Sequence, residues 1–311
     1  MRRFQQTKHA LGSMAYLTVV VQDDRQPNEL FARLWEMVDN FERRFSRFLP
    51  DSELTTFNQS AGKKHAVTLE FRTLLAAAKN MSRKTDGLYN PFVLPALQRA
   101  GYKGSWPYPE RAGAAVNYEL RQSASWQNIT LGRNWAAIPK NTAVDFGGIG
   151  KGYLLDKLAA ALHAGGVTGY WLSLGGDISC AGFDEPGTPW LIGIQDAMQE
   201  GKRIASVSNE GRALAVATSG VTKRKGMSAN GVWHHLIDPR SGLPAETDIL
   251  TATVCSDSAT EADVYAKCLV IAGADARDFM KTAKVREALL QRQSKDEGAP
   301  TIEKVGTIWL V

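Results

Sequence analysis

The fold of this chain depends on one glycine-rich stretch, Val144-Asp145-Phe146-Gly147-Gly148-Ile149-Gly150-Lys151-Gly152-Tyr153. Leucines follow it at helical spacing, at positions 154, 155, 158 and 162, so a glycine-rich loop leads into the first turn of a helix. The free N–H groups and the positive dipole end of such a helix favour a phosphate, and Lys151 adds a full charge. The loop therefore indicates a phosphate site, and a tight loop-to-helix connection is at least an equal alternative.

Two commoner phosphate-binding motifs do not match this loop. A Walker loop requires glycine, four residues and then Gly-Lys-Ser/Thr, whereas here Gly150-Lys151 is followed by Gly152 and preceded five positions earlier by Asp145. The dinucleotide fingerprint G-x-G-x-x-G is not met either, because the glycines at 148, 150 and 152 alternate.

Strands and helices are both predicted on either side of this loop. Met14 to Val21 is an apolar, β-branched run that reads as a buried strand, because eight residues are too few to span a bilayer. Asn28 to Arg47 is predicted to be an amphipathic helix and Leu69 to Lys84 a second one. Apolar residues recur every three or four positions in the first helix, at Leu30, Leu34, Val38, Phe41 and Phe45.

Three later segments could carry either structure or chemistry. The strand Tyr170 to Leu174 ends in Gly175-Gly176-Asp177-Ile178, where a ligand or another backbone could approach closely. Ala217 to Gly220 is a small-residue loop, and His234-His235 stands just before an Asp-Pro turn.

The segment from Gly101 to Asn134, including Gly104 to Pro109, has no long hydrophobic period. It therefore predicts loops and short strands of a second lobe.

Composition limits the class of protein. The 311 residues are 44% hydrophobic and 22% charged, with a formal net charge of +5 that is spread along the chain. That suits a polyanionic ligand, but a basic stripe with interleaved aromatics is missing, so nucleic acid is not expected as a partner. The cysteines have no C-x-x-C spacing and are expected to be reduced core residues, at positions 180, 255 and 268.

The N-terminus does not resemble an export signal. Met1-Arg2-Arg3 has the right charge, but polar residues from Phe4 to His9 stand where an apolar stretch should follow. We therefore expect a cytoplasmic protein without a membrane span, and a trimmed leader is the alternative.

Several segments, in the same order along the chain, resemble the FAD:protein FMN transferases of the ApbE family. The resemblance covers nearly the whole chain, so it is global. The segments are Phe45 to Leu54, Thr85 to Pro91, Asp145 to Asp156, Leu174 to Ile178, Ala217 to Gly242, and Glu261-Ala262-Asp263 on a helix from Ser258 to Ala272.

The resemblance implies an α+β protein, one ApbE-like domain over residues 1–311, with two intimate lobes and FAD in the cleft between them. The FAD pyrophosphate would lie against the loop from Asp145 to Lys151, which agrees with the phosphate interpretation. The residues implied to bind FAD are Leu11, Phe48, Leu88, Tyr89, Asn90, Asp145, Lys151 and His235, with Leu11 and Asn90 where many relatives have Met and Asp.

The implied reaction is attack by a Thr or Ser hydroxyl on the FMN-side phosphorus of FAD, with AMP leaving. His235 and Asp263 would be catalytic, His235 by positioning or proton transfer. A magnesium ion would stabilise the developing charge, held by the Gly148 carbonyl and the Asp263 carboxylate.

One predicted metal position departs from the family. Many relatives have a Thr ligand four residues after the aspartate, but here that position is Lys267, which cannot coordinate a metal while protonated. Two hypotheses have equal weight: magnesium still binds through Asp263, Gly148, phosphates and water, or the Lys267 ammonium itself lies against the pyrophosphate. An ordinary i,i+4 ion pair is the structural alternative.

The acceptor implied by the resemblance is a redox protein, such as a subunit of a membrane redox complex, with a Ser/Thr-Gly-Ala-Ser/Thr type motif. Other functions remain open from sequence. The altered metal position would also suit an FAD-binding protein without catalysis or an FAD pyrophosphatase that releases FMN and AMP. A basic protein that binds nucleic acid would show steep salt dependence and no affinity for flavin.

Overall fold

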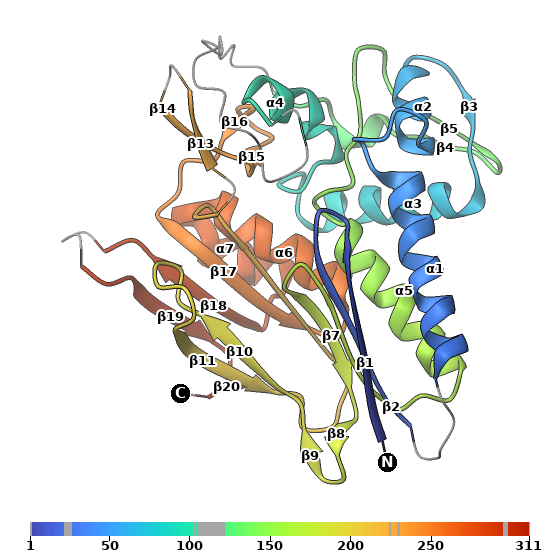
Figure 1. Ribbon diagram of the computed structural model, residues 1–311. Helices are drawn as coiled ribbons and strands as arrows, with labels where there is room; N and C mark the ends of the chain where they lie inside the picture. Colours follow the sequence, from blue (N-terminus) through green and yellow to red (C-terminus); the bar gives the residue numbers. More distant parts are fainter. Residues whose placement is uncertain are drawn as a thin grey trace.

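The computed structural model describes residues 2–21, 27–102, 104, 122–223, 225–228, 231–294 and 298–310. Within these residues, an antiparallel sheet of eight strands runs through the molecule (Figure 1). Its spatial order follows the order of its strands along the chain: β1 (Arg2–Ala10), β2 (Ser13–Val21), β6 (Gly169–Leu174), β7 (Asp177–Ala181), β12 (Leu214–Gly220), β17 (Ile249–Ser256), β18 (Glu287–Arg292) and β19 (Thr301–Val305).

The sheet is buried on both faces in its centre because its strands are apolar on both sides. In β12, Ala215 and Ala217 contribute to the large core under the helices, while Val216 between them contributes to a separate core. That second core lies under a three-stranded sheet made of β10 (Leu191–Gln195), β11 (Arg203–Ser208) and β20 (Trp309–Leu310). A short hairpin, β8 (Phe183–Glu185) with β9 (Thr188–Pro189), follows β7 in the chain.

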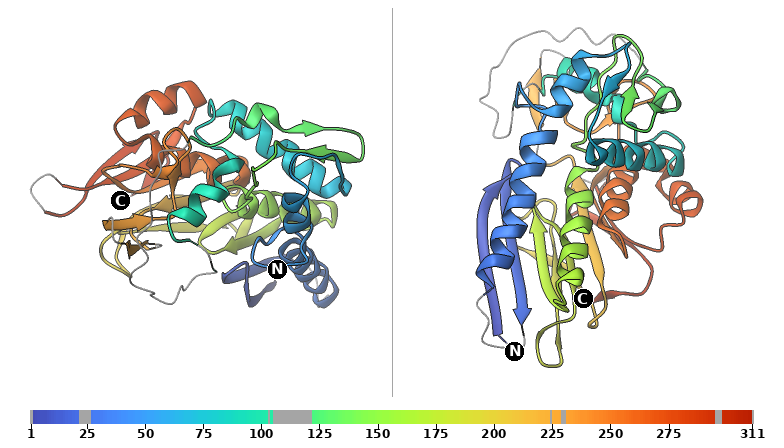
Figure 2. Two further views of the ribbon diagram at one scale, coloured as in Figure 1. Left: turned by 90° about the horizontal axis from the view of Figure 1, so that it is seen from above. Right: turned by 90° about the vertical axis from the view of Figure 1, so that its right-hand side faces the viewer.

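Three helices form a layer over the other face of the sheet (Figures 1 and 2). They are α1 (Asn28–Phe45), α5 (Gly150–Ala164) and α6 (Ala259–Ala272), and α7 (Ala276–Ala283) packs beside α6 after the short turn η3 (Gly273–Asp275). Helix α1 buries four of the five predicted apolar residues, Leu34, Val38, Phe41 and Phe45. The fifth, Leu30, is partly buried, and Phe31 beside it is buried instead. It ends at Phe45, two residues before the predicted Arg47, because Ser46 is extended, with ψ at 122°.

A smaller group of elements lies at one end of the sheet and the helical layer (Figure 1). Part of it packs through a small core in which Leu97, Ala100 and Tyr102 meet Trp233 and Ile237. Its elements are α2 (Glu53–Gln59), α3 (Leu69–Lys84), η1 (Pro91–Val93), α4 (Leu94–Arg99), η2 (Trp126–Asn128), the sheet of β3 (His65–Ala66), β5 (Trp135–Ala137) and β4 (Thr130–Leu131), and the hairpins β13 (Lys225–Ser228) with β14 (Gly231–His234) and β15 (Ile237–Asp238) with β16 (Leu243–Pro244).

The predicted α+β class is confirmed, as are the main predicted helices and strands. The predicted loop from Ala217 to Gly220 is wrong, because these residues pair with β17 as the second half of strand β12. Helix α3 has the predicted bounds, α6 begins one residue after the predicted Ser258, and β2 and β6 contain the predicted strands. The predicted segment Gly104 to Pro109 lies outside the described residues except for Gly104. The three cysteines are free and buried.

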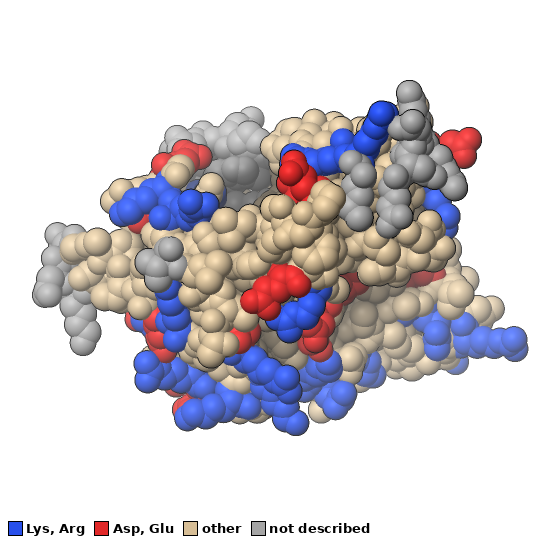
Figure 3. Space-filling view, turned by 90° about the horizontal axis from the view of Figure 1, so that it is seen from below, with Lys and Arg blue, Asp and Glu red and all other residues tan. Residues whose placement is uncertain are grey.

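The surface carries both signs of charge. On the face drawn in Figure 3, lysine and arginine side chains gather along one edge with acidic side chains among them. In the part of the chain that the structure describes, no helix has the length and apolar character needed to cross a membrane.

Candidate functional site

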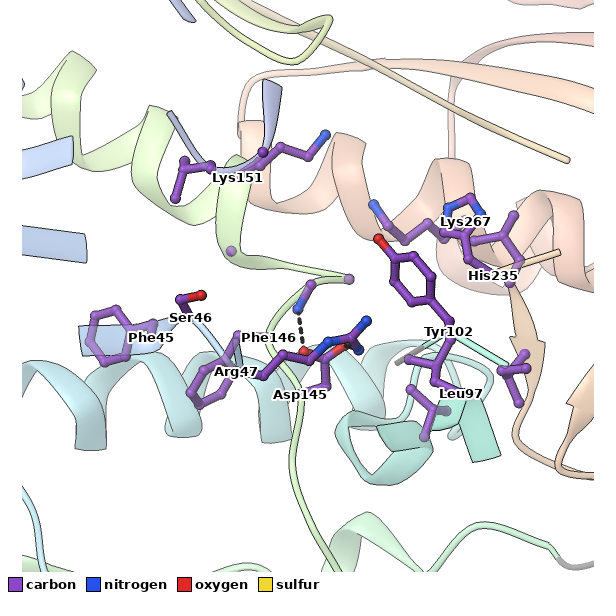
Figure 4. Close-up of a pocket in the computed structure, with 18 of the residues that line it drawn as sticks. Phe45, Ser46, Arg47, Leu97, Tyr102, Asp145, Phe146, Lys151, His235 and Lys267 are labelled. Atoms are coloured by element: carbon purple, nitrogen blue, oxygen red, sulfur yellow. Dashed lines mark hydrogen bonds and ion pairs between the residues drawn. The ribbon is translucent and has the colours of Figure 1, made fainter. Parts of the chain in front are cut away.

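A cavity of about 480 Å³ opens between the two groups of elements. Its volume is within the range of small-molecule and cofactor sites. Its walls come from the turn between β1 and β2, the end of α1, the start of α5, the middle of α6 and the segment after β14 (Figure 4). Every residue predicted for the site except Asp263 lines it: Leu11, Phe48, Leu88, Tyr89, Asn90, Asp145, Gly148, Lys151, His235 and Lys267.

The glycine-rich loop packs closely because its glycines have no side chains. A Cβ atom at Gly152 would lie 2.3 Å from the carbonyl oxygen of Ala259 and 2.8 Å from the Cβ of Asp263. Gly152 therefore lets α5 cross directly against the first turn of α6. Its own N–H donates to Oδ2 of Asp263 at 3.2 Å, which ties the loop to the α6 carboxylate.

Asp156 fixes the same two helices one turn further along α5. Its carboxylate accepts hydrogen bonds from the N–H groups of Ala259 and Thr260, at 2.7 and 3.0 Å, and from the hydroxyls of Ser258 and Thr260, at 2.8 and 2.6 Å. A carboxylate at a helix N-terminus satisfies otherwise unpaired N–H groups and complements the helix dipole. Asp156, the last residue of the family-like segment, thus has a structural role.

Asp145 is held in place by an arginine that the sequence did not single out. The Arg47 guanidinium donates to Oδ2 of Asp145 at 3.0 Å, and Gly147 N–H donates to Oδ1 at 3.2 Å. The guanidinium also lies 4.7 Å from the Phe48 ring centroid and 4.6 Å from that of Tyr102. A cation held against two aromatic rings and a carboxylate forms a rigid wall of the cavity.

Two lysine–aspartate pairs meet at the inner end of the cavity. Lys151 on α5 pairs with Asp177 at the start of β7, and Lys267 on α6 pairs with Asp263 one turn earlier on the same helix. Burial raises the pKa of Asp177, and the Lys151 and Lys267 ammonium groups oppose that rise. In Figure 4 the two lysine side chains extend from their helices toward the same part of the cavity. The Asp263 side chain is buried beneath them, at 1% exposure.

The side chains around Asp263 do not fit the magnesium ion that the resemblance implied. One carboxylate oxygen is ion-paired with Lys267 and the other accepts from Gly152 N–H. Lys267 also stands beside the second predicted ligand, since a Cβ atom at Gly148 would lie 3.7 Å from its Cδ atom. Magnesium prefers several free oxygen ligands in an octahedral arrangement. Among the described residues, no group of three or more His, Cys, Asp or Glu side chains could hold a metal ion.

Tyr89 and Asn90 have different roles in the cavity wall. The Tyr89 hydroxyl is buried and has no hydrogen-bond partner among the described residues. Burial first, and then the charges of Asp145 and Asp263, raise the pKa of Tyr89, so the hydroxyl stays protonated and can donate to a ligand. Asn90 instead bonds the backbone at both ends of its amide, accepting from Phe92 N–H at 3.0 Å and donating to the Ala124 carbonyl at 2.9 Å.

The two adjacent histidines, His234 and His235, have different roles in the structure. His235 faces the cavity, 6.3 Å from Tyr102 between ring centroids. His234 is structural, with Nε2 at 3.0 Å from the Ala245 carbonyl and Nδ1 accepting from Leu236 N–H at 3.3 Å. Burial lowers the pKa of His234, against the Ala245 hydrogen bond that raises it.

Leu11 reaches the cavity from the turn of the first hairpin. Ala10 pairs with Ser13, so Leu11 and Gly12 form a two-residue turn in which both residues have positive φ, at 55° and 68°. This is the geometry that matches the twist of antiparallel strands, and it is uncommon for leucine. The turn places a leucine side chain on the cavity wall beside the end of α1.

Sequence reasoning missed Arg47, Tyr102 and Asp177 as site residues. Arg47 and Asp177 lie inside two of the segments that resemble the ApbE family, so the resemblance could have marked both residues as candidates for the site. Tyr102 follows Gly101 in a segment without periodicity, and nothing in the sequence marks it.

The sequence is similar to a known protein family over most of its length. A model of the ApbE family matches residues 11–290. An FAD:protein FMN transferase from Vibrio cholerae is 28% identical over 246 residues, 78% of this chain and 72% of that protein. One from Treponema pallidum is 27% identical over 291 residues, 88% of this chain and 79% of its own.

Solved structures have the same fold. The crystal structure of the ApbE protein from Thermotoga maritima is 25% identical and superposes with a TM-score of 0.84, covering 98% of this chain and 97% of that one. The flavin transferase ApbE from Vibrio cholerae has a TM-score of 0.82 at 23% identity, with the same coverage of each chain.

Proposed function

This chain belongs to the ApbE family, and we propose that it is an FAD:protein FMN transferase, as its curated relatives are named. One observation carries the proposal. Segments far apart in the sequence converge on a single cavity with aromatic walls and two lysines at its inner end. Such a cavity suits a ligand with flat rings joined by a pyrophosphate, because aromatic side chains stack on rings and ammonium groups bind phosphate.

The proposed reaction is a phosphoryl-group displacement. A Ser or Thr hydroxyl oxygen of the acceptor attacks the FMN-side phosphorus of FAD, the bond from that phosphorus to the bridging oxygen breaks, and AMP leaves with the bridging oxygen. The hydroxyl proton passes to a base, and His235 is the candidate because it lines the cavity. Lys151 would stabilise the negative charge that develops on the phosphate oxygens.

The acceptor would be a redox protein with a Ser/Thr-Gly-Ala-Ser/Thr type motif. The side chain that reacts must be short and hydroxyl-bearing, and small neighbours would let the acceptor backbone approach the cavity mouth. Phe48 and Leu49 stand beside the cavity, with 42% and 40% of their surfaces exposed. They offer an apolar contact for an incoming peptide.

Two further expectations remain proposals. Residues 1–311 would form one domain, and the protein would act in the cytoplasm. Magnesium stays a prediction of the resemblance, and the arrangement around Asp263 gives it no pair of free ligands.

The direct test is covalent flavinylation. The purified protein is incubated with FAD and an acceptor domain that carries the motif, and a fluorescent flavin band is sought on a denaturing gel while AMP is quantified. We expect the band and equimolar AMP, and both should be lost when the motif hydroxyl residue is replaced by Ala. AMP and free FMN without a flavin band would instead identify a pyrophosphatase, and bound, uncleaved FAD would identify a binding protein.

A further inference from the structure

Lys267 stands in this chain where many relatives have a threonine that binds the metal ion. We propose that the Lys267 ammonium replaces the divalent ion as the cation that holds the FAD pyrophosphate, so that this protein binds FAD without a metal. The inference rests on the proposed function, because it assigns the cation that the FAD site uses.

The first argument comes from the ligands of the predicted metal site. Asp263 presents no free oxygen: Oδ1 is ion-paired with Lys267, and Oδ2 accepts from Gly152 N–H at 3.2 Å. Gly152 cannot withdraw easily, because α5 and α6 are in backbone contact at this residue. A metal ion would therefore have to displace the ammonium before it could reach the carboxylate.

The second argument is the place of the ammonium itself. Lys267 lines the cavity, its side chain is 14% exposed, and its Cδ atom lies beside Gly148. Both acceptors of the ammonium, Oδ1 and the main-chain carbonyl at 3.3 Å, belong to Asp263, which is buried beneath the cavity wall. An ammonium group has three N–H bonds, so one remains for a ligand oxygen in the cavity.

The third argument is the balance of charge. Two aspartates, Asp177 and Asp263, face two lysines, Lys151 and Lys267, so the inner end of the cavity is neutral before a ligand arrives. A divalent cation added here would gain no net attraction, because the two ammonium groups already balance the charges of the two carboxylates. Replacement of Lys267 by a neutral residue would leave one net negative charge, which a pyrophosphate would avoid unless a metal ion joined it.

The unmodified protein provides the first test and needs no variant. FAD affinity is measured by quenching of flavin fluorescence, once with excess EDTA and once with excess magnesium. We expect tight binding in EDTA and a dissociation constant that magnesium changes by less than about twofold, since no metal–ligand bond forms. Binding that requires magnesium would overturn the proposal.

Two substitutions of Lys267 separate its charge from its position. In Lys267→Met, which keeps the length but has neither charge nor ligand atom, we expect the FAD affinity measured in EDTA to fall about tenfold or more. In Lys267→Thr, which supplies a hydroxyl beside the freed Asp263 carboxylate, the loss in EDTA should be reversed by magnesium. Magnesium alone should then raise the melting temperature of Lys267→Thr and leave that of the original protein unchanged.

The matched control is Lys281→Thr, the same change at an exposed lysine on α7 that lies away from the cavity. This substitution should leave the affinity for FAD unchanged, both in EDTA and in magnesium. If Lys267→Met binds FAD as tightly as the original protein, the cation role of Lys267 is wrong while the flavin site stands. If no variant and no condition gives FAD binding, the proposed function is wrong and this inference fails with it.

Discussion

Adding one methyl group at Gly152 should loosen the contact between α5 and α6 and weaken the site at the same time. The new Cβ would lie 2.3 Å from the Ala259 carbonyl oxygen, whereas carbon–oxygen contacts are normally no shorter than about 3.3 Å. The two helices must therefore separate by about 1 Å at this point. Because the obstructing atom belongs to the backbone, no side-chain rotation can relieve the contact.

The expected cost of Gly152→Ala follows from two opposing effects. Overpacking of this kind costs about 3 kcal/mol at the upper end of its usual range. Alanine has a higher helix propensity than glycine, which offsets about 1 kcal/mol of that cost. The free energy of unfolding should therefore fall by about 2 kcal/mol.

Urea unfolding followed by circular dichroism measures this change. Ala160→Gly is the matched control, because Ala160 is exposed on the same helix and its replacement reports the helix-propensity effect alone. That control should lose about 1 kcal/mol. Gly152→Ala should also bind FAD less tightly, since the shift moves Asp263 and Lys267. A Gly152→Ala protein as stable as the original would refute the close-contact argument.

Three further results are expected. Asp156→Asn removes the charge that holds the first turn of α6, and the free energy of unfolding from urea denaturation should drop by about 1 to 3 kcal/mol; an unchanged value would contradict that role. Arg47→Met should cost about 2 to 3 kcal/mol, because Asp145 is left buried without its cation, and the double variant with Asp145→Asn should recover part of the loss. Burial lowers the pKa of His234, so the unfolded chain takes up a proton first as the pH falls through about 6.5, and stability should decrease there; His234→Asn should flatten that part of the stability–pH curve, and equal slopes would refute it.

Local signals in the sequence predicted much of the fold. The predicted bounds of helix α3 are correct because the turn Asp86-Gly87 that follows the helix is visible in the sequence. In the structure, the Thr68 side chain caps the first turn and accepts a hydrogen bond from Phe71 N–H at 3.2 Å. The last two residues of the predicted first helix were wrong because the extended backbone at Ser46 has no local sequence signal. Just beyond it, Arg47 contacts Asp145 and the rings of Phe48 and Tyr102.

The site was predictable where a motif marks it and unpredictable where distant residues meet. The glycine loop and Lys151 were found by their spacing. The Arg47–Asp145 pair joins residues 98 positions apart, and a single sequence does not report such a contact. For Lys267 the sequence left two hypotheses with equal weight. Only the placement of Asp263, with both oxygens already engaged, favours one of them.

The distribution of the cavity wall along the chain has a consequence for biosynthesis. Its residues span positions 9 to 271, from the first hairpin to α6. A chain emerging from the ribosome grows at about 5 to 20 residues per second, so the first hairpin waits many seconds for the helix that completes the pocket. The cavity wall is complete only after α6 has been synthesised. FAD, the proposed substrate, would therefore meet the whole site only after that point.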